Sequence, residues 1–196
     1  ITAISSIISK YLRKKNIIKD EDYPVYQYGF EIVLSTILGF IVTFSIGCIL
    51  SMKTLSLVYY VIFVFMRECT GGYHADSYLK CNVVFGILSF FTMGMTTLIT
   101  ISKQYDYYIF LLLIVVTLSV IWRYSPVENE YKPLTGEQKA KNHWLGFILA
   151  AILSIAGYIM LLYKNKLGVL IILTLFMIAM LILVSKVMCK EKTKKE

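Results

Sequence analysis

The sequence predicts an all-α membrane protein with six transmembrane helices and an amphipathic helix in the membrane plane at its N-terminus. Three observations support this fold class. Hydrophobic residues make up 58% of the 196 residues, and charged residues only 16%, well below the ~25% of an average soluble domain. Several apolar runs approach the ~20 residues that a helix needs to cross a bilayer. The later runs contain no charged residue before their ends. The length is that of a single domain, which we expect to comprise residues 1–196.

The N-terminal segment, residues 1–22, has the pattern of an amphipathic helix. Its apolar run is too interrupted to cross a bilayer, and its basic residues favour anionic lipid headgroups. We therefore expect this helix to lie in the plane of the membrane surface. An ordinary helix packed against the bundle is the alternative. Its apolar positions at helical spacing are Ile1, Ile4, Ile7, Ile8, Tyr11 and Leu12.

Six apolar segments follow over residues 30–187. The first, 32–50, comes directly after Glu31, a carboxylate that we expect at the interface or facing the bundle, because it is costly in lipid. The second, 52–66, is short: residues 55–66 cover only ~18 Å as a helix. It therefore either crosses with the help of flanking residues or is re-entrant. The remaining segments are 83–101, 107–122, 144–163 and 167–187, and a charged tail, 188–196, follows them.

The distribution of Lys and Arg predicts the side on which each loop lies. With the N-terminus inside, the inner segments 1–29, 67–81, 123–143 and 186–196 hold 16 of the 20 Lys and Arg, in keeping with the positive-inside rule. We therefore expect a multi-pass cell-membrane protein with both termini in the cytoplasm. The net charge of +8 follows from this topology and does not indicate nucleic-acid binding. The polar segments 67–81 and 126–142 would share the cytoplasmic side, where one substrate could contact both.

The polar interruption at residues 67–81 contains one of the two histidines and two of the four cysteines. A cysteine nucleophile needs a base or a cation that generates its thiolate. We interpret His74 and Cys81 as such a dyad, at the membrane surface. On one continuous helix, residues seven positions apart lie ~10.5 Å apart along the axis, which is too far for a hydrogen bond. The helix must therefore break between them.

Neighbouring residues fit supporting roles around this dyad. Gly71 and Gly72 give the chain a flexible start. Asp76 or Ser77 is a good N-cap for a helix that places the nucleophile in about its first turn, where the helix dipole favours a thiolate. Asp76 could instead orient the histidine, as the third member of a triad does. Arg67 either anchors at lipid headgroups or binds a substrate carboxylate.

The same residues also have ordinary structural interpretations. His74 fits equally as a polar residue at the interface, and Cys81 as a small packing residue. Cys69 is an alternative nucleophile. The other histidine, His143, lies beside Trp144 and has the character of an interface residue. No CxxC pair occurs, and the spacing of Cys69, His74 and Cys81 differs from that of typical metal ligands. We therefore expect neither a metal nor another cofactor.

The combination of Arg67, Gly71-Gly72, His74-Ala75 and Cys81 in a six-span chain of this length resembles the accessory gene regulator protein B (AgrB) family. A single GGxHA motif is a weak signal, whereas this spacing of Arg, His and Cys together is specific. The resemblance covers nearly the whole chain. It extends to the basic amphipathic start, Gly29-Phe30-Glu31, and the segment Pro126-Val127-Glu128-Asn129-Glu130-Tyr131-Lys132-Pro133-Leu134.

The resemblance implies a membrane-embedded cysteine endopeptidase acting on a short propeptide similar to AgrD, with an acidic C-terminal part. By matching position, Cys81 is the nucleophile and His74 the general base. Cleavage would leave an acyl-enzyme thioester, and a Cys or Ser within the substrate would then close a thiolactone or lactone ring, giving a quorum-sensing peptide.

Positive loops suit an acidic substrate tail, so Lys132, Lys139 and Lys141 are candidate substrate contacts, although positive-inside topology explains them equally. Glu31 is a further candidate. In the fifth apolar segment Gly146, Ala150 and Ser154 recur every four residues, which lets another helix approach closely. This pattern leaves a homodimer open.

Two other functions remain open from the sequence. One is a peptide transporter or permease, and the other is a membrane factor that binds the propeptide without catalysis. Spans three to six contain no charged residue before their ends, so an ion-coupling relay of the kind that many transporters use is not evident.

Overall fold

The computed structural model describes residues 1–71, 78–103, 105–127 and 135–193. Within these ranges helices are the only regular elements, which confirms the predicted all-α fold. They are α1 (Thr2–Lys14), α2 (Tyr23–Ile49), α3 (Lys53–Thr70), α4 (Tyr78–Ser102), α5 (Tyr107–Tyr124), α6 (Gly136–Leu162) and α7 (Lys166–Thr193).

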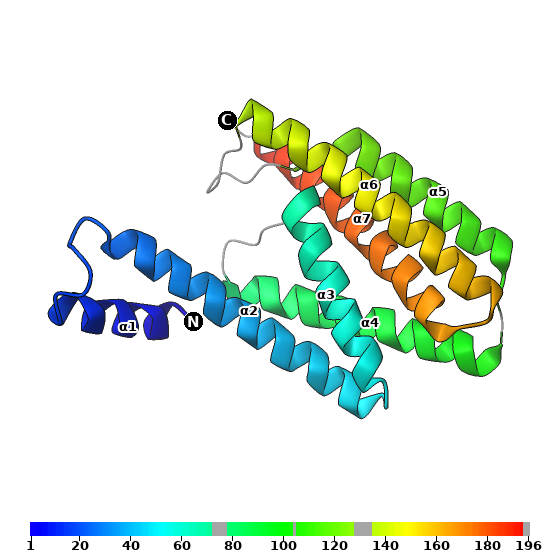
Figure 1. Ribbon diagram of the computed structural model, residues 1–196, viewed down its shortest axis with the longest axis horizontal. Coiled ribbons are helices and arrows are strands. Elements are labelled where there is room, and N and C mark those ends of the chain that lie inside the picture. Colours follow the sequence, from blue (N-terminus) through cyan, green and yellow to red (C-terminus); the bar gives the residue numbers. More distant parts are fainter. Residues whose placement is uncertain (72–77, 104, 128–134, 194–196) are drawn as a thin grey trace.

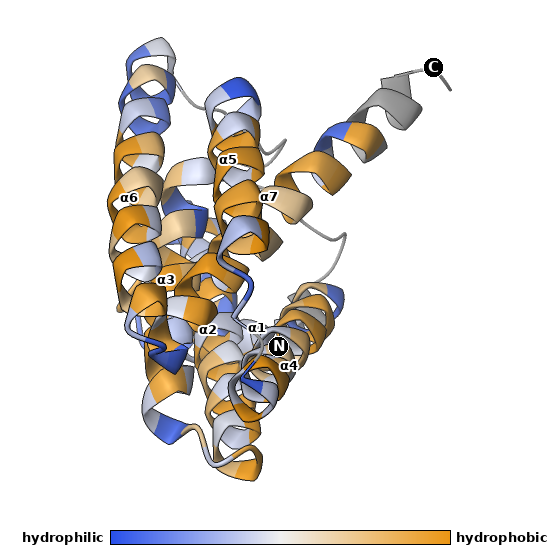
Figure 2. Cartoon of the chain, turned by 90° about the vertical axis from the view of Figure 1, so that its right-hand side faces the viewer, coloured by the Kyte–Doolittle hydropathy of each residue, from blue (hydrophilic) through white to orange (hydrophobic). Residues whose placement is uncertain are grey.

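Five of these helices are long and apolar enough to cross a membrane: α2, α4, α5, α6 and α7. Large apolar residues are exposed on all five, and Figure 2 shows hydrophobic residues along much of α5 and α6. Such a surface suits lipid and not water, so the chain is a multi-pass membrane protein. The second predicted span corresponds to α3, which is not among the five. Six spans, or a re-entrant α3, therefore stay predictions.

Helix α7 lies at the centre of the bundle and packs against α3, α4, α5 and α6. Two-thirds of its apolar stretch is buried, against at most 28% in the other four candidate spans. In Figure 1, α5 and α6 run alongside α7, while α1 and α2 lie at the opposite edge. Helix α3 joins the two sides, because it packs against α2, α6 and α7.

The contact of α3 with α7 is filled by large side chains. Tyr59, Phe63 and Met66 of α3 and Leu170 and Ile178 of α7 are all buried in one cluster. Close packing of this kind holds helices together inside a bilayer, where burial from water contributes little. The C-terminal end of α3, from which the polar motif starts, is therefore held in place by the core.

The small-residue stripe of α6 packs within the chain. A side chain at Gly146 would meet Cys69 and Thr70 of α3, and Ala150 and Ser154 are fully buried. The stripe thus lets α3 and α7 approach α6, and its residues are not free for a second copy. The pattern on which the sequence left a homodimer open therefore gives no ground for one.

Helix α1 packs against the first part of α2. Ser5 and Ser9 are buried in this contact, and the Ser5 hydroxyl donates to Glu31 Oε1 at 3.2 Å. The apolar residues Ile4 and Ile7 stay exposed, as a helix in contact with lipid requires. The in-plane orientation itself stays a prediction.

Candidate functional site

The ends of α3 and α5 meet at the start of α6. The backbone N–H of Val127, which follows α5, donates to the carbonyl of Thr70 at 2.9 Å. Gly71 and Val127 form an isolated parallel β-bridge, and the Ser125 hydroxyl lies 3.4 Å from the same Thr70 oxygen. The two polar segments singled out in the sequence are therefore in direct contact. The side of the membrane on which they lie stays a prediction.

Gly71 is required by this close approach. Its φ of 67° and ψ of −152° lie in a region that only glycine adopts without strain. A Cβ at this position would overlap the carbonyl oxygen of Val127 and lie 3.0 Å from the Val127 nitrogen. The residue predicted as a flexible start is thus held in a defined backbone conformation.

Cys81 lies in the first turn of α4, because α3 ends at Thr70 and α4 begins at Tyr78. One continuous helix therefore does not run from α3 to Cys81, whereas the break between His74 and Cys81 stays a prediction. The thiol of Cys81 is free and partly exposed. The next residue, Asn82, donates its side-chain amide to the Ser35 hydroxyl at 2.7 Å, which holds the start of α4 against α2.

Arg67 provides a positive charge that is near enough to Cys81 for the two groups to attract each other. It lies partly buried in the last turn of α3. Burial lowers the pKa of Arg67, and attraction to Cys81 and then to Glu68 opposes that shift. A guanidinium nevertheless remains protonated in proteins, so the cation is permanent.

Cys69, the alternative nucleophile, has a less suitable environment. It lies partly buried at the end of α3, beyond the apolar stretch 52–66 and against Gly146 of α6. Burial raises the pKa of the Cys69 thiol, and the neighbouring Glu68 carboxylate raises it further. A thiol that stays protonated is a weak nucleophile, so these surroundings do not favour Cys69 as the nucleophile.

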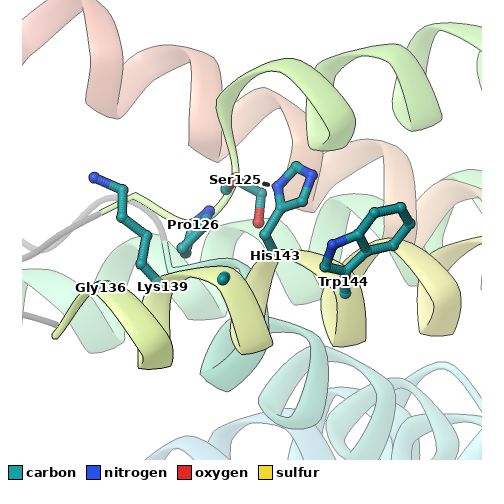
Figure 3. A pocket seen from close by; sticks show the side chains of 7 residues that line it. Ser125, Pro126, Gly136, Lys139, His143 and Trp144 are labelled. Carbon is teal, nitrogen blue, oxygen red and sulfur yellow. Dashed lines mark hydrogen bonds between the residues drawn. The ribbon is translucent and has the colours of Figure 1, made fainter.

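An open pocket of about 370 Å³ lies next to the bridge (Figure 3). His143 Nδ1 lies 2.7 Å from the Ser125 carbonyl oxygen, and the ring of Trp122 packs at 5.1 Å from the His143 ring. The sequence predicts only an interface residue at His143, because its partner is a backbone carbonyl that no side-chain pattern marks. The lining residues are Ser125, Pro126, Gly136, Lys139, Ala140, His143 and Trp144.

The candidate substrate contacts are distributed unevenly. Lys139 lines the pocket, and Lys141 is exposed on α6. Glu31 of α2 instead accepts hydrogen bonds from Ser5 of α1 and from Gln27. Helices α1 and α2 lie at the edge of the molecule opposite α5 and α6 (Figure 1). The remaining predicted site residues fall outside the described part of the chain: Gly72, His74, Asp76, Ser77 and Lys132.

Comparison with known proteins decides the family. The model of a family described as "Accessory gene regulator B" matches residues 5–184. The chain belongs to the AgrB family. The predicted resemblance is thereby confirmed, and membership gives the chain a role in the accessory gene regulator quorum-sensing system, with a link to the AgrD propeptide of that system.

Relatives of this AgrB-family chain agree with that result. It is 23% identical over 171 residues to a putative AgrB-like protein of Clostridium perfringens, covering 84% of this chain and 79% of the relative. It is 25% identical over 168 residues to a putative AgrB-like protein of Clostridium beijerinckii, covering 85% and 79%. It is 27% identical over 124 residues to accessory gene regulator protein B of Staphylococcus aureus, covering 63% and 64%. No solved structure matches the chain.

Proposed function

We propose that this AgrB-family chain is a cysteine endopeptidase that cleaves an AgrD-like propeptide and promotes its cyclisation. The observation that carries the proposal is the free, partly exposed thiol of Cys81 in the first turn of α4, with the guanidinium of Arg67 near enough to attract it electrostatically. His74 lies four residues before the start of α4 in the sequence and is the proposed general base.

The reaction proceeds in two acyl transfers. His74 takes the thiol proton as the sulfur of Cys81 attacks the carbonyl carbon between the signal sequence and the acidic part. The C–N bond breaks, the proton passes to the leaving amine, and the acidic fragment departs. A thiol or hydroxyl within the bound peptide then attacks the thioester, which closes the ring and returns the proton to Cys81.

Cyclisation depends on position more than on driving force. A thiol–thioester exchange breaks and forms the same kind of bond, so it is nearly isoenergetic. Holding the internal nucleophile near the acyl carbon can contribute several kcal/mol by proximity. A site at the boundary of the lipid also limits competing attack by water.

The basic residues near α6 suit the acidic part of the propeptide. Lys139 lines the pocket beside Pro126, and Lys141 lies close to it in the sequence, on the exposed surface of the same helix. With Lys132 they would attract a carboxylate-rich peptide towards the junction of α3, α5 and α6. Glu31 is assigned to holding α1, since Ser5 donates to it.

The membrane supplies the second partner. The exposed apolar residues of α1 accompany Lys10, Arg13 and Lys14 on the same helix, which suits anionic lipid. In the proposed topology both termini and the Cys81 site face the cytoplasm. A single cysteine is placed at residue 1 or at residue 196, and intact cells are treated with a membrane-impermeant maleimide. Reaction of either cysteine from outside would contradict this topology.

Reconstituted protein tests the activity. Full-length protein in anionic liposomes is mixed with candidate propeptides, and cleavage and ring formation are followed by mass spectrometry. We expect Cys81→Ala and His74→Ala to slow cleavage at least about a thousandfold. Cys69→Ala and the control Cys48→Ala, on the exposed surface of α2, should cleave at near the wild-type rate.

Two results would overturn the assignment. Undiminished cleavage by Cys81→Ala would remove the proposed nucleophile, and loss of cleavage in Cys69→Ala would transfer the role to Cys69. A propeptide-dependent adduct on Cys81, trapped by acid quenching and located by mass spectrometry, would identify the thioester directly.

A further inference from the structure

His143 makes a short contact that the proposed chemistry does not use. Its Nδ1 lies 2.7 Å from the carbonyl oxygen of Ser125, the residue that follows the end of α5. A carbonyl can only accept, so Nδ1 carries the hydrogen in this bond. Figure 3 shows the imidazole projecting from α6 towards Ser125. Packing of Trp122 and Trp144 on the ring limits its rotation.

The segment that His143 holds is bonded to α3 on its other side. The N–H of Val127 donates to the Thr70 carbonyl at 2.9 Å, and Gly71 is paired with Val127. A continuous set of contacts therefore runs from α6 through residues 125–127 to the last residue of α3. Beyond Gly71 the chain leads to the residues that include His74.

We propose that His143 is a positioning residue for the peptidase reaction, an inference that rests on the proposed function. It fixes the segment 125–127, and through Val127 it fixes the point at which the chain leaves α3 towards His74. His143 acts on the reaction through these hydrogen bonds and not by contact with the reacting atoms.

A rigid donor is needed at this place because a displaced segment would misplace the base. Small errors in the position of a catalytic group lower the rate strongly, while the affinity for substrate is unchanged. Loss of one hydrogen bond raises the ratio of displaced to anchored 125–127 segment by a factor of about two to about ten. We expect kcat to fall by a similar factor and KM to stay the same.

Three variants of the full-length protein in liposomes test the inference. His143→Ala removes the donor. His143→Asn places an amide N–H where Nδ1 lies, whereas His143→Gln carries its amide about one bond further out. Leu145→Ala, at an exposed position of α6, is the matched control. Hydrogen exchange of the Val127 amide and the kcat and KM of propeptide cleavage are measured for each.

We expect faster Val127 exchange and a lower kcat in His143→Ala and His143→Gln, and near wild-type values in His143→Asn and Leu145→Ala. If His143→Ala does not fold, the comparison of His143→Asn with His143→Gln still tests whether the donor at this position matters. The inference is overturned if Asn behaves like Gln, if Val127 exchange is unchanged in all variants, or if KM rises while kcat holds. A wild-type protein inert towards every propeptide would refute the proposed function, whereas Val127 exchange would still decide whether His143 anchors the segment.

Discussion

Replacing Gly71 by alanine should open the bridge between α3 and the segment after α5. The backbone at Gly71 has φ 67° and ψ −152°, a conformation that costs a non-glycine residue about 1–3 kcal/mol. The new Cβ would also overlap the Val127 carbonyl oxygen, so the backbone of one partner must move. The Val127–Thr70 hydrogen bond, worth about 1 kcal/mol, is a restraint that such a movement would break.

The expected result is local opening with the bundle intact. A strain of about 1–3 kcal/mol corresponds to roughly a 5- to 150-fold faster exchange of the Val127 amide by hydrogen–deuterium exchange mass spectrometry. Propeptide cleavage should slow with it. Gly94→Ala in α4, where a Cβ meets no atom within 4 Å, is the control and should change neither quantity. Wild-type Val127 exchange in Gly71→Ala would show that the strain argument is wrong.

Three further predictions concern the packing that supports the site. Gly168→Ala should lower the melting temperature in detergent, because its Cβ would lie 2.5 Å from backbone atoms of α6 and overpacking costs about 1–3 kcal/mol. An unchanged melting temperature would contradict the close approach of α6 and α7 at this glycine. A double-mutant cycle of Asn82→Ala and Ser35→Ala should give a coupling of about 1 kcal/mol from their 2.7 Å hydrogen bond, and additive effects would mean that the bond contributes nothing. Thr135→Ala should destabilise the start of α6 by about 1 kcal/mol, because it removes the capping box with Gln138. The loss should be measurable as faster hydrogen exchange of the Gln138 amide. Equal protection of this amide in both proteins would exclude a role for the cap.

Much of the local structure was predictable because it depends on neighbours in the sequence. Apolar length indicated the long helices, and the glycines and polar residues at 71–77 indicated that the helix ends before Cys81. The end of α3 at Thr70 shows that one continuous helix does not run through this motif, while the break between His74 and Cys81 stays a prediction. The family followed from the spacing of Arg67, His74 and Cys81, and the family comparison confirmed it.

Contacts between distant segments could not be predicted in the same way. Gly146 and the small residues after it looked available to a second copy, but α3 and α7 of the same chain occupy that surface. His143 looked like an ordinary interface residue, yet it bonds to a carbonyl 18 positions away. A backbone carbonyl is present at every residue, so the sequence carries no mark of which one is used.

The sequence by itself determined that the chain is helical, lies in a membrane and carries a cysteine at the start of a helix after a polar break, because hydropathy and helix-breaking residues act locally. Only the tertiary structure decided that Gly71 pairs with Val127, that Arg67 comes within electrostatic range of Cys81 and that α6 holds the end of α5. These contacts depend on how α3, α6 and α7 pack, and packing is a property of all the helices together.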